Sequence, residues 1–183
     1  MNAPLNALQK EALQEKLKRQ LFASPSLKAY AVLDGASNPA LLDHLYATER
    51  PEFVCLFRGD LEPDMAECAP YLVKLERGSA FTEWVTGQCW GNHWGIFAVA
   101  TADLRDMRQH LRKFNMVYDP EAKEPLYFRY YDPRVIVDFL GISDPEQSVA
   151  FFGPVRAFFG ETDAGAILTR YELHGEKVQA DPI

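Results

Sequence analysis

The residues best suited to chemistry lie where the first two predicted strands end. Asp34 ends the first of these strands, and Arg58 and Asp60 follow the second. Because open α/β sheets bind ligands beyond the carboxyl ends of their strands, neighbouring strands would bring these two carboxylates and one guanidinium together as a small-ligand site. Such a site would make the chain an enzyme or a sensor. The alternative is a pair of turns, since both aspartates adjoin a glycine, and we favour it because no nucleophile, base or metal ligand accompanies the set.

Motifs of the common enzyme classes do not occur in the sequence. It contains no GxSxG elbow, no HExxH zinc motif, no Walker loop and no GxGxxG fingerprint. Cys55, Cys68 and Cys89 form no CxxC pair, and the four histidines fall on separate predicted elements. We therefore predict no catalytic residue, no metal site and no cofactor. His93, between two tryptophans, is the histidine best placed for proton transfer or recognition, although packing in an aromatic cluster explains it equally well.

Three arginines share one face of a helix predicted over residues 102–114. Arg105, Arg108 and Arg112 stand at positions i, i+3 and i+7, a spacing that aligns side chains on a helix surface. This face is either an ordinary solvated surface or a docking surface for an acidic segment of a partner, where arginine supplies directional contacts.

Aromatic residues are abundant, with 12 Phe, 8 Tyr and 3 Trp making 13% of the chain. Most of these rings are expected in the core. The remainder, with arginine, are the residue types that anchor protein interfaces. The candidates for such a partner surface are Trp90, Trp94, Tyr130, Tyr131 and Arg134.

Length and composition predict a single globular domain. The 183 residues are 48% hydrophobic and 25% charged, and the formal net charge of −7 disfavours binding to nucleic acid. No basic N-terminal region precedes an apolar run, and no apolar stretch is long enough to cross a membrane. We expect a cytoplasmic protein that does not insert into membranes.

Alternating strand and helix patterns predict an α/β fold with a mixed, largely buried sheet covered by helices. Residues 1–26 are expected to hold an N-terminal amphipathic helix, residues 27–153 an α/β core, and residues 154–183 a small C-terminal appendage of a hairpin and a polar tail. The predicted strands cover residues 27–33, 53–57, 71–75, 93–99, 116–118, 126–131, 155–159 and 166–173. The predicted helices cover residues 5–22, 39–48, 63–68, 80–86, 102–114, 133–140 and 145–151, and Ser79, Asp132 and Asp144 are expected to cap three of them.

A series of short motifs, in this order, resembles the adaptor or chaperone family of bacterial type VI secretion systems. The motifs are residues 30–36, 55–59, 69–75, 90–96, 104–114, 128–135 and 151–154. The resemblance implies a non-enzymatic cytoplasmic protein that binds a secreted toxin effector and promotes its loading onto the VgrG spike. It supplies no catalytic residue, and it leaves open whether residues 129–134 contact a partner or organise the fold.

Overall fold

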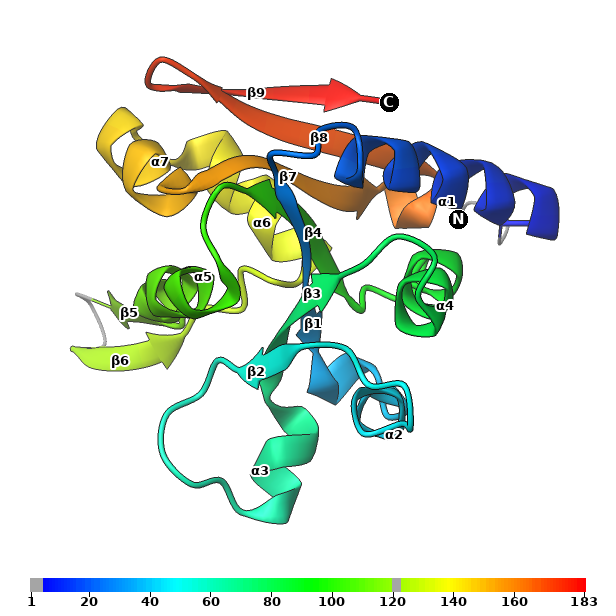
Figure 1. The fold of residues 1–183 in the computed structure, drawn as a ribbon. Helices are drawn as coiled ribbons and strands as arrows, with labels where there is room; N and C mark the ends of the chain where they lie inside the picture. Colours follow the sequence, from blue (N-terminus) through cyan, green and yellow to red (C-terminus); the bar gives the residue numbers. More distant parts are fainter. Residues whose placement is uncertain (1–4, 120–122) are drawn as a thin grey trace.

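The computed structural model describes residues 5–119 and 123–183, which form a seven-stranded sheet, a separate two-stranded hairpin and helices on both faces of the sheet (Figure 1). Every strand pairing among these residues is antiparallel. The sheet has the order β2-β3-β1-β4-β7-β8-β9. Its strands are β1 (Lys28–Asp34), β2 (Phe53–Cys55), β3 (Pro70–Leu75), β4 (Gly95–Ala100), β7 (Val155–Thr162), β8 (Ile167–His174) and β9 (Lys177–Pro182). The hairpin is β5 (Met116–Asp119) with β6 (Glu124–Tyr127).

Alternate residues of the central strands enter two separate cores. On β1, Ala29, Ala31 and Leu33 belong to one hydrophobic cluster, whereas Tyr30 and Val32 belong to the other. The first cluster lies beneath α1, α2 and α4, and the second beneath α5, α6 and α7 (Figure 1). A sheet covered on both faces is apolar on both sides of its strands, so the predicted α/β class with a largely buried sheet is confirmed. The helices are α1 (Ala7–Leu21), α2 (Leu41–Leu45), α3 (Pro63–Cys68), α4 (Ala80–Gln88), α5 (Leu104–Leu111), α6 (Pro133–Ile142) and α7 (Pro145–Phe152), with short 3-10 helices η1 (Gly35–Ser37), η2 (Arg112–Phe114) and η3 (Asp163–Gly165).

The N-terminal helix α1 is amphipathic, as predicted, and packs on the body of the protein. Its buried stripe consists of Leu13, Leu17 and Leu21. On its flank, Lys18 Nζ lies 2.9 Å from a carboxylate oxygen of Glu83 on α4. The apolar side of α1 is therefore part of the hydrophobic core of the protein.

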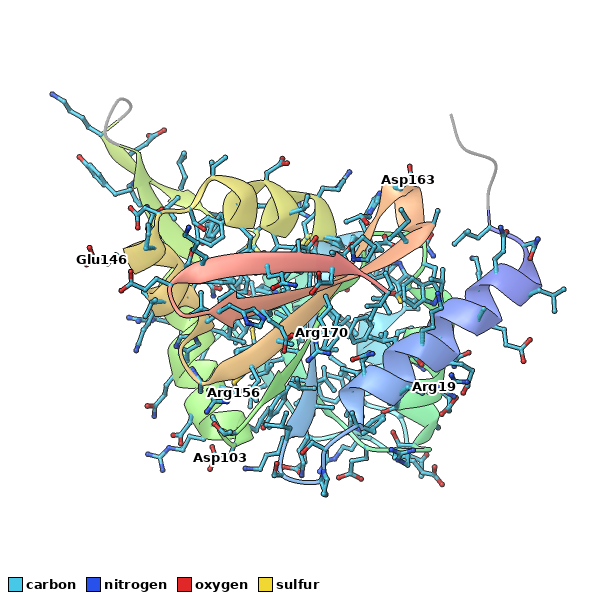
Figure 2. All side chains as sticks on the ribbon, turned by 90° about the horizontal axis from the view of Figure 1, so that it is seen from above. Arg19, Asp103, Glu146, Arg156, Asp163 and Arg170 are labelled. Atoms are coloured by element: carbon cyan, nitrogen blue, oxygen red, sulfur yellow. The ribbon has the colours of Figure 1, made fainter. Side chains whose placement is uncertain are left out.

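The C-terminal segment extends the same sheet, which corrects the expectation of an appendage. β7 pairs with β4, and β8 and β9 follow as the next strands. Arg170 of β8 is labelled in Figure 2. It donates to the side chain of Gln20 on α1 at 3.1 Å and to Glu172 at 2.6 Å. β9 falls in the segment predicted to be a polar tail.

Several predicted element boundaries differ from the observed ones. The helix predicted over residues 102–114 begins at Leu104, because Asp103 caps it, and its last turn is η2. The helix predicted over residues 39–48 is shorter in the structure, where α2 follows η1. The strand predicted over residues 126–131 is also different, because β6 ends at Tyr127 and the following residues form a loop before α6. Within the described ranges, no helix is long and apolar enough to cross a membrane.

Candidate functional site

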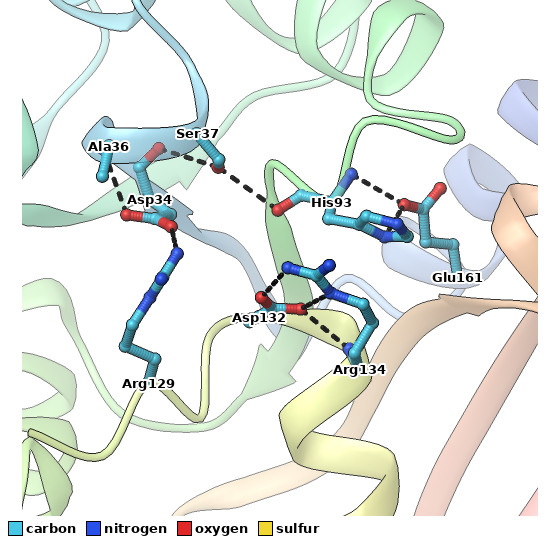
Figure 3. Close-up of polar contacts among 8 residues, drawn as sticks. All are labelled: Asp34, Ala36, Ser37, His93, Arg129, Asp132, Arg134 and Glu161. Carbon is cyan, nitrogen blue, oxygen red and sulfur yellow. Dashed lines mark hydrogen bonds and ion pairs between the residues drawn. The ribbon is translucent and has the colours of Figure 1, made fainter.

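Three buried carboxylates lie near the end of β1 (Figure 3). Asp34 ends β1, Asp132 caps α6 and Glu161 lies in β7, and their side chains are at most 5% exposed. Removing a carboxylate from water is costly unless hydrogen bonds or opposite charges replace its hydration. The partners of these groups therefore show what the cluster does.

Asp34 joins the turn after β1 to the segment before α6. One of its oxygens accepts the Ala36 N–H at 3.1 Å, and the other accepts a hydrogen bond from the Arg129 guanidinium. Burial works against the charged form of Arg129, but the hydrogen bond and the charge of Asp34 outweigh it and raise the Arg129 pKa. The Arg129 side chain remains 45% exposed, so the buried Asp34 carboxylate is paired with a cation that reaches the protein surface.

Asp132 holds the first turn of α6. Its carboxylate accepts the Arg134 backbone N–H at 2.9 Å and two further bonds from the Arg134 guanidinium, at 3.0 and 2.6 Å. Burial alone would raise the pKa of Asp132, but the side chain and backbone N–H of Arg134 lower it. This capping role was predicted, and the Arg134 guanidinium, with its side chain 64% exposed, reinforces it.

Glu161 fixes the turn between α4 and β4. Its two carboxylate oxygens accept the backbone N–H groups of Gly91, at 2.5 Å, and His93, at 2.9 Å. His93 has a φ of 53°, in the left-handed region that non-glycine residues rarely adopt, and its Nδ1 lies 2.9 Å from Glu161 Oε1. The Ser37 hydroxyl lies 3.3 Å from the His93 carbonyl oxygen, so this turn also contacts η1.

Two of the three carboxylates accept hydrogen bonds from distant segments. Asp34 connects the end of β1 with the segment before α6, and Glu161 connects β7 with the α4–β4 turn (Figure 3). Asp132 accepts its bonds from Arg134 in the first turn of the same helix. The arrangement is that of a structural polar cluster, with Arg129 and Arg134 on its outer side. Over residues 5–119 and 123–183, no group of three or more His, Cys, Asp or Glu is arranged to hold a metal ion.

The structure does not assemble the small-ligand site considered from the sequence. β3 separates β1 from β2, and Asp34 is buried against Arg129. Arg58 and Asp60 are exposed, and Arg58 lies with the arginines of α5. The proposed convergence fails because β1 and β2 are not neighbours.

A basic groove runs along α5, with a volume of about 440 Å³. Its lining residues are Arg58, Arg105, Arg108, Gln109, Arg112 and Lys113. The predicted face of Arg105, Arg108 and Arg112 is thus one wall of this groove. Among the described residues, no lining cation forms an ion pair with a carboxylate.

Two of the groove arginines donate hydrogen bonds to backbone carbonyls at the end of β2 and in the loop after it. Arg108 Nε donates to the Cys55 carbonyl at 3.1 Å, and the Arg112 guanidinium donates to the Phe57 carbonyl at 2.9 Å. Burial, together with the charges of Arg108 and Arg58, lowers the Arg112 pKa. The guanidinium groups are therefore held in place by neutral oxygens while their charges remain uncompensated.

An apolar pocket of about 410 Å³ adjoins the basic groove. Both cavities share Arg58, Arg112 and Lys113. The other residues lining the apolar pocket are Leu56, Phe57, Leu61, Met65, Asn115, Met116 and Tyr127. The pocket thus lies between the loop after β2 and the β5–β6 hairpin.

The aromatic residues predicted at a partner surface are mostly inside the protein. Trp90 is 2% exposed and donates from Nε1 to the Thr86 carbonyl at 2.7 Å, and Tyr130 and Tyr131 are at most 4% exposed. Trp94 is partly buried, with its ring 5.3 Å from that of Trp84. Burial removes Trp90, Tyr130 and Tyr131 from the candidate surface. Of the predicted set, Trp94, the groove arginines and Arg134 remain exposed or half-exposed.

Two features were not found from the sequence. The predicted strand over residues 155–159 leaves Glu161 in a turn, although an acidic residue directly after the apolar run 157–160 is a signal for a buried carboxylate with partners. The hairpin is predicted, but the exposure of its apolar side chains is not. Met116, Val117, Tyr118, Leu126 and Tyr127 are between 41% and 65% exposed.

The fold and these sites define an antiparallel α/β protein of three layers, with a buried carboxylate cluster and a basic groove beside an exposed apolar hairpin. Residues 29–150 match the family described as "Domain of unknown function (DUF4123)", and the chain belongs to this family. No curated protein and no solved structure matches the chain.

Proposed function

We propose that this chain is a cytoplasmic, non-enzymatic adaptor that binds a type VI secretion effector and promotes its loading onto the VgrG spike. Its family, DUF4123, is known as a family of such adaptors, and the match over residues 29–150 covers every residue that lines the basic groove and the apolar pocket. The role requires a surface that recognises another protein.

The observation that carries the proposal is the unpaired basic groove beside exposed apolar side chains. Arginine and aromatic residues are enriched where proteins recognise one another, and exposed apolar patches mark such surfaces. Met116 and Tyr127 of the hairpin line the pocket that adjoins this groove, and three further exposed apolar residues lie on the same two strands. The carboxylate cluster supports the same role indirectly, because it fixes the loops of the core.

The test is co-expression of the full chain with the effector and spike proteins encoded beside it. We expect a stable complex that elutes as one species in size-exclusion chromatography. A parallel sample of the effector alone shows whether the chain also raises the soluble yield of the effector. If folded chain at micromolar concentration binds neither protein, the proposal is wrong.

A further inference from the structure

The basic groove carries a chemical signature more specific than a general protein-binding surface. Five cations line it, from the loop after β2, α5 and η2, in a chain whose formal net charge is −7. Like charges held close together repel one another unless a counter-charge is supplied. Since none of the described carboxylates pairs with these cations, the counter-charge must come from solvent ions or from a bound partner.

The guanidinium groups are also pre-positioned for a partner. Carbonyl oxygens of residues 55 and 57 fix one N–H of Arg108 and one of Arg112, which leaves other donors of each group unused. Within the described residues, the buried Nε of Arg112 has no hydrogen-bond partner. Arginines fixed in this way lose little side-chain entropy when they bind a carboxylate, whose two oxygens match the guanidinium fork.

The apolar pocket next to the groove indicates that a bound segment also presents an apolar side chain. Phe57 and Tyr127, whose ring centroids lie 5.3 Å apart, form one wall, and Met116 contributes a flexible side chain that is 41% exposed. Three cations line both cavities, so one extended segment can reach both. The β5–β6 hairpin lies beside α5, outside the main sheet, so the pocket is at the outer surface (Figure 1).

We propose that the basic groove and the apolar pocket together bind a short acidic segment of the partner, with its carboxylates on the guanidinium groups and one aliphatic or aromatic side chain in the pocket. This inference rests on the proposed adaptor function, and it specifies the chemistry of the effector segment. Charge complementarity selects an acidic peptide, and the shared lining residues place its apolar side chain within a few residues of its carboxylates.

The first test uses a labelled acidic peptide, with glutamates and aspartates flanking a single leucine, and fluorescence anisotropy with the full chain. The test variant is Arg105→Glu with Lys113→Glu, since both side chains are exposed and lie outside the carbonyl bonds that fix the groove. The matched control is Lys16→Glu with Arg19→Glu, an equal charge change on exposed positions of α1. α1 covers the other face of the sheet.

We expect the groove variant to bind the peptide about tenfold more weakly than the wild type, because each reversed charge replaces attraction by repulsion. The control variant should bind as the wild type does. A peptide with alanine in place of leucine should also lose about tenfold, because the apolar contact is removed. The proposal would be overturned if the groove variant and the control variant bound the peptide equally well. It would also be overturned if replacing the leucine by alanine left the affinity unchanged, or if the wild type bound a single-stranded DNA oligonucleotide more tightly than the peptide.

The second test applies the same variants to the effector complex, so that two kinds of failure can be separated. If the complex forms and the groove variant weakens it while the control does not, the proposal is supported. If the complex forms equally with both variants, the groove is not the effector site, although the adaptor function stands. If the folded chain binds the peptide through the groove but neither effector nor spike, the adaptor function is wrong and only the peptide chemistry of the groove survives.

Discussion

Glu161→Gln is the substitution that most directly tests the structural role of the buried carboxylate cluster. The native carboxylate accepts the N–H groups of Gly91 and His93, one on each oxygen, and its side chain is 5% exposed. Glutamine keeps the shape but offers one oxygen, and its NH₂ group would face a backbone donor. One backbone N–H would keep a bond, now to a neutral oxygen, and the other would lose its charge-assisted bond and face the NH₂ group.

The expected cost follows from these two losses. A hydrogen bond to a charged group contributes about 1.5–3 kcal/mol, and an unsatisfied buried donor adds a comparable penalty, so we expect a loss of about 2–4 kcal/mol in the free energy of unfolding. For a domain of this size each kcal/mol lowers the melting temperature by about 2–4 °C. The melting temperature should therefore fall by roughly 5–15 °C.

Differential scanning calorimetry measures this fall, and amide hydrogen exchange locates it. The control is Glu172→Gln, which removes a partly exposed ion pair with Arg170 and should cost less than about 1 kcal/mol. Faster exchange should appear at the amides of Gly91 and His93 in the Glu161 variant alone. A melting temperature no lower than that of the control, with exchange unchanged at this turn, would refute the assignment of Glu161 as its anchor.

The remaining predictions concern other parts of the core. Leu17→Ala should destabilise the protein by about 2–5 kcal/mol in chemical denaturation, because Leu17 is fully buried, whereas Leu8→Ala, at a position 77% exposed, should have little effect; equal effects would mean that α1 is not part of the core. Gly153→Ala should cost about 2 kcal/mol or more, since the glycine has a φ of 47° and a Cβ would lie 2.3 Å from the His110 ring; an unchanged melting temperature would contradict this close contact. Burial, with the charge of Lys113, lowers the His110 pKa, so the stability linked to His110 is complete above its ordinary pKa of about 6.5 and is lost as pH falls toward the lower folded value. Melting temperatures measured against pH should show this loss in the wild type and a smaller one in His110→Gln, and parallel curves would exclude His110 as its source.

Local sequence signals predicted the elements of the fold well, because they act within a few residues. Ser79, Asp132 and Asp144 cap helices where the sequence indicated caps. The alternation of apolar residues on both faces of a strand likewise predicted a covered sheet. β9 was missed because its side chains are mostly exposed and polar, so an edge strand of this kind carries no hydrophobic pattern.

The candidate sites could be predicted only in part, because they depend on contacts between distant residues. The three arginines of α5 were grouped correctly, since a helix fixes their spacing. The pairing of Asp34 with Arg129 joins residues 95 positions apart, and no local pattern encodes it. Composition alone gave the wrong location for the exposed rings, because Tyr130 and Tyr131 belong to a buried cluster, whereas the exposed rings include Tyr118 and Tyr127 of the hairpin.

The cations of the groove differ in whether they also stabilise the fold, and this difference determines how the proposed surface can be tested. Arg108 and Arg112 hold the backbone at the end of β2 and just after it through their carbonyl bonds, so their substitution would change the fold and the charge together. Arg105 and Lys113 are exposed and lie outside these bonds, so reversing their charges leaves the bonds in place. Loss of binding in the variant at these two positions, with an unchanged melting temperature, would therefore report on recognition, whereas the same loss in an Arg112 variant would not distinguish recognition from a displaced β2 loop.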